Sequence, residues 1–388
     1  MFSVRTGWPR QPNRLSLLLR AKRERGGRIL DLTLSNPTEA GIAYPTADIL
    51  SSLQRPEALR YLPNPRGIPE AREAIAAYYQ ATGVAVDPGS LMLTAGTSEA
   101  YALLFALLCD PGETVLVPAP CYPLFEYIAR IASVQVASYP LWYDGEWHLD
   151  LNAVGSLLER GARGLVAIHP HNPTGMYLKR EELAALHEML SRARAALIVD
   201  EVFIEYPLAA SAGAAISTAG PAPILTFTLN GVSKMAGLPH MKVAWVAVSG
   251  PAPEKEEALE RLEILGDTYL TVNTMVQAAL PTLLCAGELV RGEIRRRLHG
   301  NLAILDDLLA GHPLCSRLHA EGGWYAVIRV PGTRTDEEWA VTMLEEADVL
   351  IHPGYFFDFP LGGHLVLSLL PEPALFSAGV EAMLRRVS

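Results

Sequence analysis

Short apolar runs alternate with longer helical patterns from about residue 90 to about residue 250. Each run is rich in Val, Ile, Leu or Ala and is followed by a polar or Gly/Pro turn, which is typical of buried strands in a mainly parallel sheet. The expected strands are Leu91–Thr94, Thr114–Val117, Gly164–His169, Ala196–Asp200, Ile224–Thr228 and Lys242–Val248. Thr97–Cys109 is apolar nearly all round and Glu181–Arg194 is amphipathic, so both are predicted helices. Strands that alternate with helices predict an α/β domain.

The pattern changes after about residue 252. The elements expected there are charged helical stretches at Glu254–Leu265 and Leu289–Leu309, strands at Gly322–Val330 and His364–Leu369, and a helix at Asp336–Ala347. They predict a smaller α+β domain, which we expect the N-terminal segment to complete. The expected division is a large domain over residues 46–270 and a small domain formed by residues 1–45 and 271–388.

The composition fits two packed domains and excludes several classes of protein. The 388 residues are 50% hydrophobic and 19% charged, so the chain is not disordered and can bury a large interior. The net charge of -10 argues against binding to nucleic acid. No apolar stretch has the roughly 18 residues that a membrane span needs. The four widely spaced cysteines indicate reduced thiols and no metal site, and with no signal peptide we expect a cytoplasmic protein.

Polar residues follow four of the predicted strands. They are Thr97-Ser98, His171-Asn172, Asp200-Glu201 and Ser233-Lys234. Ligands of an open α/β sheet gather at the carboxyl ends of its strands, so we expect these residues to converge on one crevice.

Three of these strand ends carry distinct chemistry. Lys234 lies in apolar surroundings, which lower the pKa of a lysine and allow it to act as a nucleophile and a base, although a lysine in a surface loop is the alternative. Asp200 ends an apolar run, where a buried carboxylate needs a cation; the alternative is a helix N-cap. Gly96-Thr97-Ser98 opens a helix and suits an anion, or forms an ordinary cap.

The order of the motifs along nearly the whole chain resembles the fold type I aminotransferases, in the class I/II group that includes aspartate aminotransferase. The matching motifs are Tyr61 with Gly67, Gly96-Thr97-Ser98, Pro120-Cys121-Tyr122, the His-Asn-Pro-Thr-Gly sequence at 171–175, Asp200-Glu201, Ser233-Lys234 and Pro353-Gly354. The resemblance implies the PLP-dependent transferase fold type I. That fold is α/β, with a large domain whose mainly parallel mixed sheet is flanked by helices, and a small α+β domain.

The resemblance also implies a cofactor and a reaction. The cofactor is pyridoxal 5′-phosphate (PLP), and the reaction is ping-pong transamination from an amino donor, expected to be an amino acid, to a 2-oxo acid. Lys234 carries PLP as a Schiff base and then moves a proton between Cα and C4′. Asp200 pairs with the pyridinium nitrogen, Asn172 hydrogen-bonds the phenolic oxygen and Tyr122 stacks on the ring.

The phosphate and the partner subunit are implied in the same way. Gly96, Thr97, Ser98 and Ser233 hold the phosphate, and Tyr61 reaches the phosphate of the neighbouring subunit, which implies a homodimer. The expected partners are a small-molecule amino donor and an oxo acid, with no nucleic acid and no membrane.

Three positions depart from the family pattern. Phe203 replaces a tyrosine that bonds the phenolic oxygen, so we expect a raised pKa for the Schiff base. Lys242, eight residues after Lys234, replaces an arginine that binds the phosphate bidentately. Val366, two residues before Ser368, falls where the family has the arginine that binds the substrate carboxylate.

The missing arginine leaves the substrate contacts and the reaction type open. Arg329 and His364 are candidate replacements. Asn36 is a candidate for the substrate entrance, with a simple turn as the alternative, and Trp324 is a candidate for the substrate wall, with a core tryptophan as the alternative. A PLP-dependent lyase or decarboxylase on the same fold is a rival function. A non-catalytic ligand-sensing module is a second rival.

Overall fold

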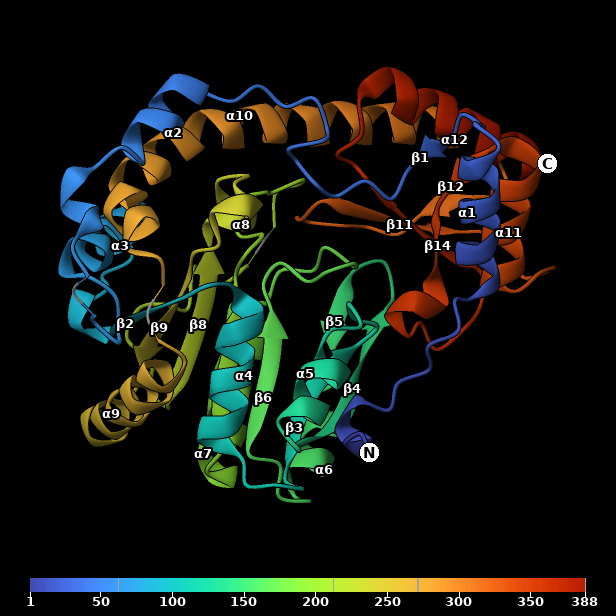
Figure 1. Cartoon of the computed structure of the whole chain (residues 1–388). Helices are drawn as coiled ribbons and strands as arrows, with labels where there is room; N and C mark the ends of the chain where they lie inside the picture. The colour runs from blue at the N-terminus through green and yellow to red at the C-terminus, as the bar shows by residue number, and fades with distance from the viewer. Residues whose placement is uncertain (62, 212, 271, 388) are drawn as a thin grey trace.

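The computed structural model describes residues 1–61, 63–211, 213–270 and 272–387. Its largest element is an eight-stranded sheet at the lower centre of Figure 1. In spatial order the strands are β2 (Leu91–Thr94), β9 (Ala244–Ser249), β8 (Thr226–Gly231), β7 (Ala196–Asp200), β6 (Gly164–Ile168), β3 (Thr114–Ala119), β4 (Gln135–Tyr143) and β5 (Trp147–Leu149).

The direction of the strands confirms the predicted mainly parallel mixed sheet. The strands β8, β7, β6, β3 and β4 pair in parallel, whereas β2, β9 and β5 join antiparallel. The prediction missed β4 and β5. In β4 buried and exposed positions are mixed and Pro140 interrupts the apolar pattern, because the strand lies close to the edge of the sheet.

Helices cover both faces of this sheet. Side chains of α4 (Thr97–Leu108), α5 (Phe125–Ile131) and α9 (Ala252–Tyr269) share one core with one face of the strands. Side chains of α6 (Leu151–Leu158) and α7 (Arg180–Ala193) pack against the other face. Consecutive strand residues such as Val115 and Leu116 belong to different cores, so both faces are buried and the strands read as continuous apolar runs.

A second group of strands lies to the right of the large sheet in Figure 1. The antiparallel strands β10 (Ser316–Arg317), β11 (Tyr325–Arg329), β14 (His364–Ser368) and β13 (His352–Pro353) form one sheet. The N-terminal strand β1 (Leu30–Asp31) pairs in parallel with β12 (Val349–Leu350), so the two ends of the chain are joined. The helices around these strands are α1 (Arg14–Glu24), α11 (Asp336–Ala347) and α12 (Pro373–Val387).

One long helix links the two groups of strands. Helix α10 (Thr274–Ala310) has 37 residues and runs along the top of Figure 1, from α2 (Thr46–Ser52) and α3 (Pro69–Ala81) to α12. Its first half shares a core with α3 and β9, and its second half shares a core with β11 and α12. The expected domain boundary at residue 270 therefore lies just before α10, and α10 packs against elements of both expected domains.

The remaining elements are short. They are α8 (Val232–Met235) and the 3-10 turns η1 (Val4–Thr6), η2 (Pro56–Leu59), η3 (Pro88–Ser90), η4 (Pro239–Met241) and η5 (Gly354–Phe357). No described helix combines the length and the apolar character that a membrane crossing requires.

The close approach of α10 to α8 gives a test of this packing. A Cβ on Gly287 would overlap the Cβ of Ala236, directly after α8, whereas a Cβ on Gly292 in the same helix meets nothing within 4 Å. Gly287→Ala should lower the free energy of unfolding by about 1–3 kcal/mol because the two backbones must separate. Gly292→Ala should raise it by about 0.5–1 kcal/mol, since Ala favours the helix. Urea denaturation of both variants measures the difference, and equal effects would contradict the packing.

Candidate active site

The carboxyl ends of the parallel strands open onto one cavity of about 210 Å³. Five residues that the sequence predicts for the site line it, although they come from widely separated parts of the chain: Thr97, Tyr122, Asn172, Asp200 and Lys234. The other lining residues are Ser35, Tyr101, Leu124, Phe125, Ile168, Val202, Phe203 and Tyr325. The sequence analysis did not single out Ser35, Tyr101 or Tyr325, because each reaches the cavity through tertiary contacts that no local motif reveals.

Lys234 lies on α8, which begins where β8 ends. The hydroxyl of Tyr206 donates to the carbonyl oxygen of Lys234 at 2.6 Å and so holds its backbone. The Lys234 Nζ lies 3.4 Å from the carbonyl oxygen of Ser35 and 5.0 Å from the ring centroid of Trp324. Burial lowers the pKa of Lys234 to about 8, because the charged form loses its water. Roughly a tenth of the amine is therefore neutral and nucleophilic at pH 7, against less than a thousandth of an ordinary lysine with a pKa of about 10.4.

Asp200 ends strand β7 inside the same cavity. Its Oδ2 accepts a hydrogen bond from the hydroxyl of Tyr101 at 2.9 Å, and its Oδ1 accepts one from the backbone N–H of Val202 at 3.0 Å. Burial raises the pKa of Asp200 to about 6, while these two donors oppose the rise. A buried carboxylate with an uncompensated charge is costly, so a cation placed beside it would be strongly favoured.

Asn172 lies in the His-Asn-Pro-Thr-Gly loop after β6. Its Oδ1 is buried and has no hydrogen-bond partner among the described residues, so the side chain has unused hydrogen-bonding capacity beside the cavity. The neighbouring His171 is buried, does not line the cavity, and its Nδ1 contacts the hydroxyl of Thr174 at 2.9 Å. His169 is structural, since its two ring nitrogens bond the backbone N–H of Leu178 and the carbonyl of Ala215.

Helix α4 points its N-terminus toward the cavity. Gly96 is the residue before the helix, Thr97 begins it, and no side chain caps its first turn in the structure. Ser98 is exposed and Ser233 is half-buried. Free N–H groups at the start of a helix, together with hydroxyl side chains, form an anion site. This geometry suits a phosphate.

Lys242 lies beside this site but outside the cavity that contains Lys234. It is exposed, and it lines an adjoining hollow of about 450 Å³ together with Ala95, Glu99 and His240. The carboxylate of Glu99 accepts a hydrogen bond from the backbone N–H of Ala95 at 2.5 Å. The start of α4 therefore contributes to both cavities: Ala95 and Glu99 line the hollow, and Thr97 lines the cavity that contains Lys234.

An aromatic cluster surrounds Phe203, which lines the cavity. Trp324 is fully buried, and its ring packs edge-on against Phe203 at 5.4 Å and against Tyr206 at 5.2 Å. Phe203 also packs against Tyr325 at 6.3 Å. Phe203 has no hydroxyl, so its side chain cannot donate a hydrogen bond into the cavity. The packed rings fill this region with apolar surface.

The structure separates the candidates for a substrate-carboxylate contact. Val366 is fully buried and pairs with Val327 and His352 in the small sheet. His364 and Arg329 are paired at one end of β14 and β11, whereas Tyr325 at the other end lines the cavity. With about 3.3 Å per residue, four residues of strand separate His364 and Arg329 from the cavity by roughly 13 Å.

Two further candidates lie close to the cavity and one lies at the surface. Asn36 is next to the lining residue Ser35, and its side chain bonds Thr38 in a local turn. Tyr122 lines the cavity with a half-exposed ring. Tyr61 is 68% exposed and does not line the cavity of its own chain.

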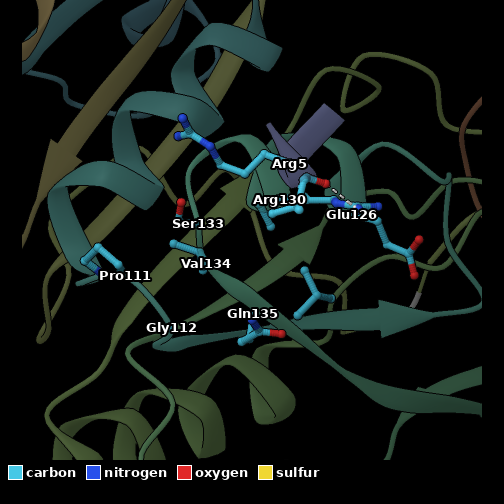
Figure 2. A pocket seen from close by; sticks show the side chains of 11 residues that line it. Arg5, Pro111, Gly112, Glu126, Arg130, Ser133, Val134 and Gln135 are labelled. Carbon is cyan, nitrogen blue, oxygen red and sulfur yellow. Dashed lines mark hydrogen bonds between the residues drawn. The ribbon is translucent and has the colours of Figure 1, made fainter. Parts of the chain in front are cut away.

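Figure 2 shows a larger hollow, about 680 Å³, between the N-terminal segment and α5. Arg130 donates to the carbonyl of Val4 at 2.6 Å, and Arg5 donates to the carbonyl of Ile131 at 3.2 Å, so two arginines tie the segment to the helix. None of the predicted site residues lines this hollow. The chemistry therefore belongs to the smaller cavity around Lys234.

The residues around Lys234 fit PLP. The chain supplies a buried amine for the aldehyde, a buried carboxylate for the ring nitrogen, the side-chain N–H of Asn172 for the phenolic oxygen and a helix N-terminus for the phosphate. These groups are complementary to the chemical groups of PLP.

Comparison with known proteins agrees with this fit. A family profile described as aminotransferase class I and II matches residues 30–372. The glutamate-pyruvate aminotransferase AlaA of Escherichia coli K12 is 27% identical over 368 residues, which cover 92% of this chain and 90% of that protein. An alanine aminotransferase of Mycobacterium tuberculosis H37Rv is 28% identical over 372 residues, which cover 92% of this chain and 85% of the other.

Solved structures show the same fold. An aminotransferase from Escherichia coli superposes with a TM-score of 0.87 at 25% identity and covers 100% of this chain and 98% of its own. The alanine aminotransferase of Pyrococcus furiosus has a TM-score of 0.85 at 22% identity, covering 96% of this chain and 95% of its own. The profile match spans most of the chain, and the chain belongs to the aminotransferase class I and II family of PLP-dependent enzymes.

Proposed function

We propose that Lys234 is the residue that binds PLP covalently in this transaminase and that it moves the proton during amino transfer. One observation carries the proposal: Lys234 is the one lysine among the described residues that line the cavity, and burial lowers its pKa to about 8. Enzymes of this family transfer the amino group of a donor to an oxo acid by a ping-pong mechanism. Lys234 therefore acts as nucleophile first and as base afterwards.

The chain's own groups divide the work. Bound PLP supplies an aldehyde and a ring that accepts electrons. Lys234 would take the proton from the donor's Cα and deliver it to C4′, and the hydrogen bond from Tyr206 keeps the backbone of Lys234 in place. Asp200 accepts the hydrogen bond of the ring nitrogen, Asn172 donates to the phenolic oxygen, and Tyr122 covers one face of the ring.

We assign the phosphate to the N-terminus of α4. Gly96 and Thr97 present backbone N–H groups, and Thr97, Ser98 and Ser233 present hydroxyls. Lys242 adds a positive charge from the adjoining hollow, as a point charge without the fork geometry of an arginine.

We infer that the donor is an amino acid with an uncharged side chain. Among the described residues that line the cavity there is no arginine, and Lys234 is committed to the cofactor. We assign the substrate side to Ser35 and Tyr325, which line the cavity, and to their chain neighbours Asn36 and Trp324. The names of two relatives contain alanine, or glutamate and pyruvate; alanine fits this inference, whereas glutamate carries a side-chain carboxylate. A separate dicarboxylate pocket has no support in this lining.

We further propose a homodimer that works in the cytoplasm. Tyr61 is exposed and does not line the cavity of its own chain, as expected of a residue that completes the neighbouring subunit's phosphate site. The four cysteines are free, as is usual in a reducing compartment. The large domain is assigned to residues 46–270 and the small domain to residues 1–45 and 271–388, with α10 shared between them.

Lys234→Ala should lower turnover by roughly a thousandfold or more, because both the covalent link and the base are lost. The visible absorbance of the lysine-bound cofactor should also disappear. Lys255→Ala is the matched control, since its Nζ bonds Ser90 away from the cavity, and it should retain turnover. Retained turnover in Lys234→Ala would overturn the mechanism. Repeated keto-product formation without an oxo-acid acceptor, beyond one equivalent per active site, would indicate a lyase instead.

The pH dependence of cofactor attachment tests the state of the amine. Only neutral lysine attacks the aldehyde, so attachment of PLP to the cofactor-free protein should accelerate as pH rises through the lowered pKa of Lys234, about 8. The rate is followed by the visible absorbance after mixing at several pH values. A midpoint near the ordinary lysine value of about 10.4 would show that the amine is not desolvated.

Mixed dimers test the contribution of Tyr61 to the neighbouring subunit. Neither Tyr61→Ala nor Lys234→Ala should form a fully active site when alone. In a hybrid of the two chains, one cavity combines an intact Lys234 with an intact Tyr61 from the partner. Turnover per hybrid should therefore recover to about half of the wild-type value when random mixing is corrected for. No recovery above the Tyr61→Ala homodimer would show that Tyr61 serves its own chain.

A further inference from the structure

Tyr101 is a buried residue of the cavity that no sequence motif assigns. It lies on α4 and is 1% exposed, and its hydroxyl donates to Oδ2 of Asp200 at 2.9 Å. The other carboxylate oxygen accepts the backbone N–H of Val202. Tyr101 is therefore the one side chain among the described residues that donates a hydrogen bond to Asp200.

Packing fixes the Tyr101 hydroxyl in this position. Its ring meets Phe125 edge-on at 5.0 Å and Phe105 at 6.0 Å. Tyr101 lies four residues after Thr97, so both lie on the same face of α4 and both line the cavity. One helix face thus carries a residue of the proposed phosphate site and, one turn further, the partner of Asp200.

The electrostatic surroundings of Asp200 give the hydroxyl a specific effect. The titratable groups that interact electrostatically with Asp200 are Tyr101 on α4, Cys121 in the loop after β3 and Glu201 next in the chain. Tyr122, Lys234 and Tyr325 line the same cavity. Desolvation favours the protonated form of Asp200, and a hydroxyl donor favours the carboxylate. Without that donor the carboxyl group would hold its proton more tightly.

We propose that Tyr101 is a positioning residue that orients the carboxylate of Asp200 and keeps it an acceptor for the protonated ring nitrogen of the cofactor. The inference rests on the proposed role of Asp200. A ring nitrogen that carries the proton makes the cofactor a strong electron acceptor, and this requires the proton to stay on nitrogen and not on Asp200. The Tyr101 hydroxyl biases the proton toward nitrogen because it weakens Asp200 as a base.

The test replaces the hydroxyl and keeps the ring. In Tyr101→Phe, the protonation midpoint of Asp200 in the cofactor-free full-length protein should rise by about one pH unit or more, because a hydrogen bond to a charged group is lost. Infrared titration of protein labelled with carbon-13 aspartate measures the midpoint, with Asp200→Asn to identify the band. The same variant should bind PLP roughly tenfold more weakly at neutral pH.

Tyr139→Phe is the matched control. Tyr139 is equally buried, but its hydroxyl donates to the backbone carbonyl of Val166 at 2.8 Å. A loss of packing or of one buried hydrogen bond appears in both variants as lower stability, whereas only Tyr101→Phe should shift the Asp200 midpoint. An equal shift in both variants, or no shift in Tyr101→Phe, would overturn the proposal.

If Tyr101→Phe does not fold, protein with a fluorotyrosine at position 101 provides a second test. Its more acidic hydroxyl is a stronger donor of nearly the same shape, so the Asp200 midpoint should fall. An unchanged midpoint would again overturn the proposal. The titration uses cofactor-free protein, so its result does not depend on whether Lys234→Ala loses turnover. Failure of the proposed function and failure of the Tyr101 assignment can therefore be told apart.

Discussion

The site depends on removing two ionisable groups from water at the end of one sheet. Lys234 and Asp200 line a single cavity. Burial lowers the pKa of Lys234 and raises the pKa of Asp200, and both shifts favour the uncharged form. Neither group is neutralised by the other within a hydrogen bond, since Asp200 bonds Tyr101 and Val202 while the Lys234 amine faces a backbone carbonyl. Both groups therefore carry a desolvation cost. A ligand that reacts with the amine through an aldehyde and pairs with the carboxylate through a ring nitrogen would reduce that cost.

Three distant segments must meet to close this cavity. The backbone N–H of Ser368 donates to the carbonyl of Leu32 at 2.7 Å, and that of Leu369 donates to the carbonyl of Trp324 at 2.8 Å. These bonds join the N-terminal loop that carries Ser35 to the ends of β14 and β11. Backbone hydrogen bonds therefore hold together the side of the cavity that Ser35 and Tyr325 line. The segments that form this side lie outside the large sheet.

Much of this arrangement could be predicted from the sequence, for physical reasons that differ between elements. The strands β6 and β7 are buried on both faces, so their apolar runs are continuous and easily recognised. The polar residues after them mark the site because a parallel sheet brings its carboxyl ends together. The edge strand β5 and its neighbour β4 lack that continuous signal and were missed.

The partners of the site residues could not be predicted in the same way. Tyr101 and Tyr206 look like ordinary core aromatic residues in the sequence, and only the packed structure shows that their hydroxyls reach Asp200 and Lys234. The absence of a hydroxyl at Phe203 was visible in the sequence, but the packing of Trp324 against it was not.

Helix α10 has a consequence for how the chain folds. Its 37 residues span about 55 Å, and its two halves belong to two different hydrophobic cores. A break in the middle of the helix would expose apolar surface on both sides at once, so neither core loses its half of the helix without loosening the other. Helix α10 therefore couples the packing of the two cores, in addition to the contacts that the large and small sheets already share within one of them.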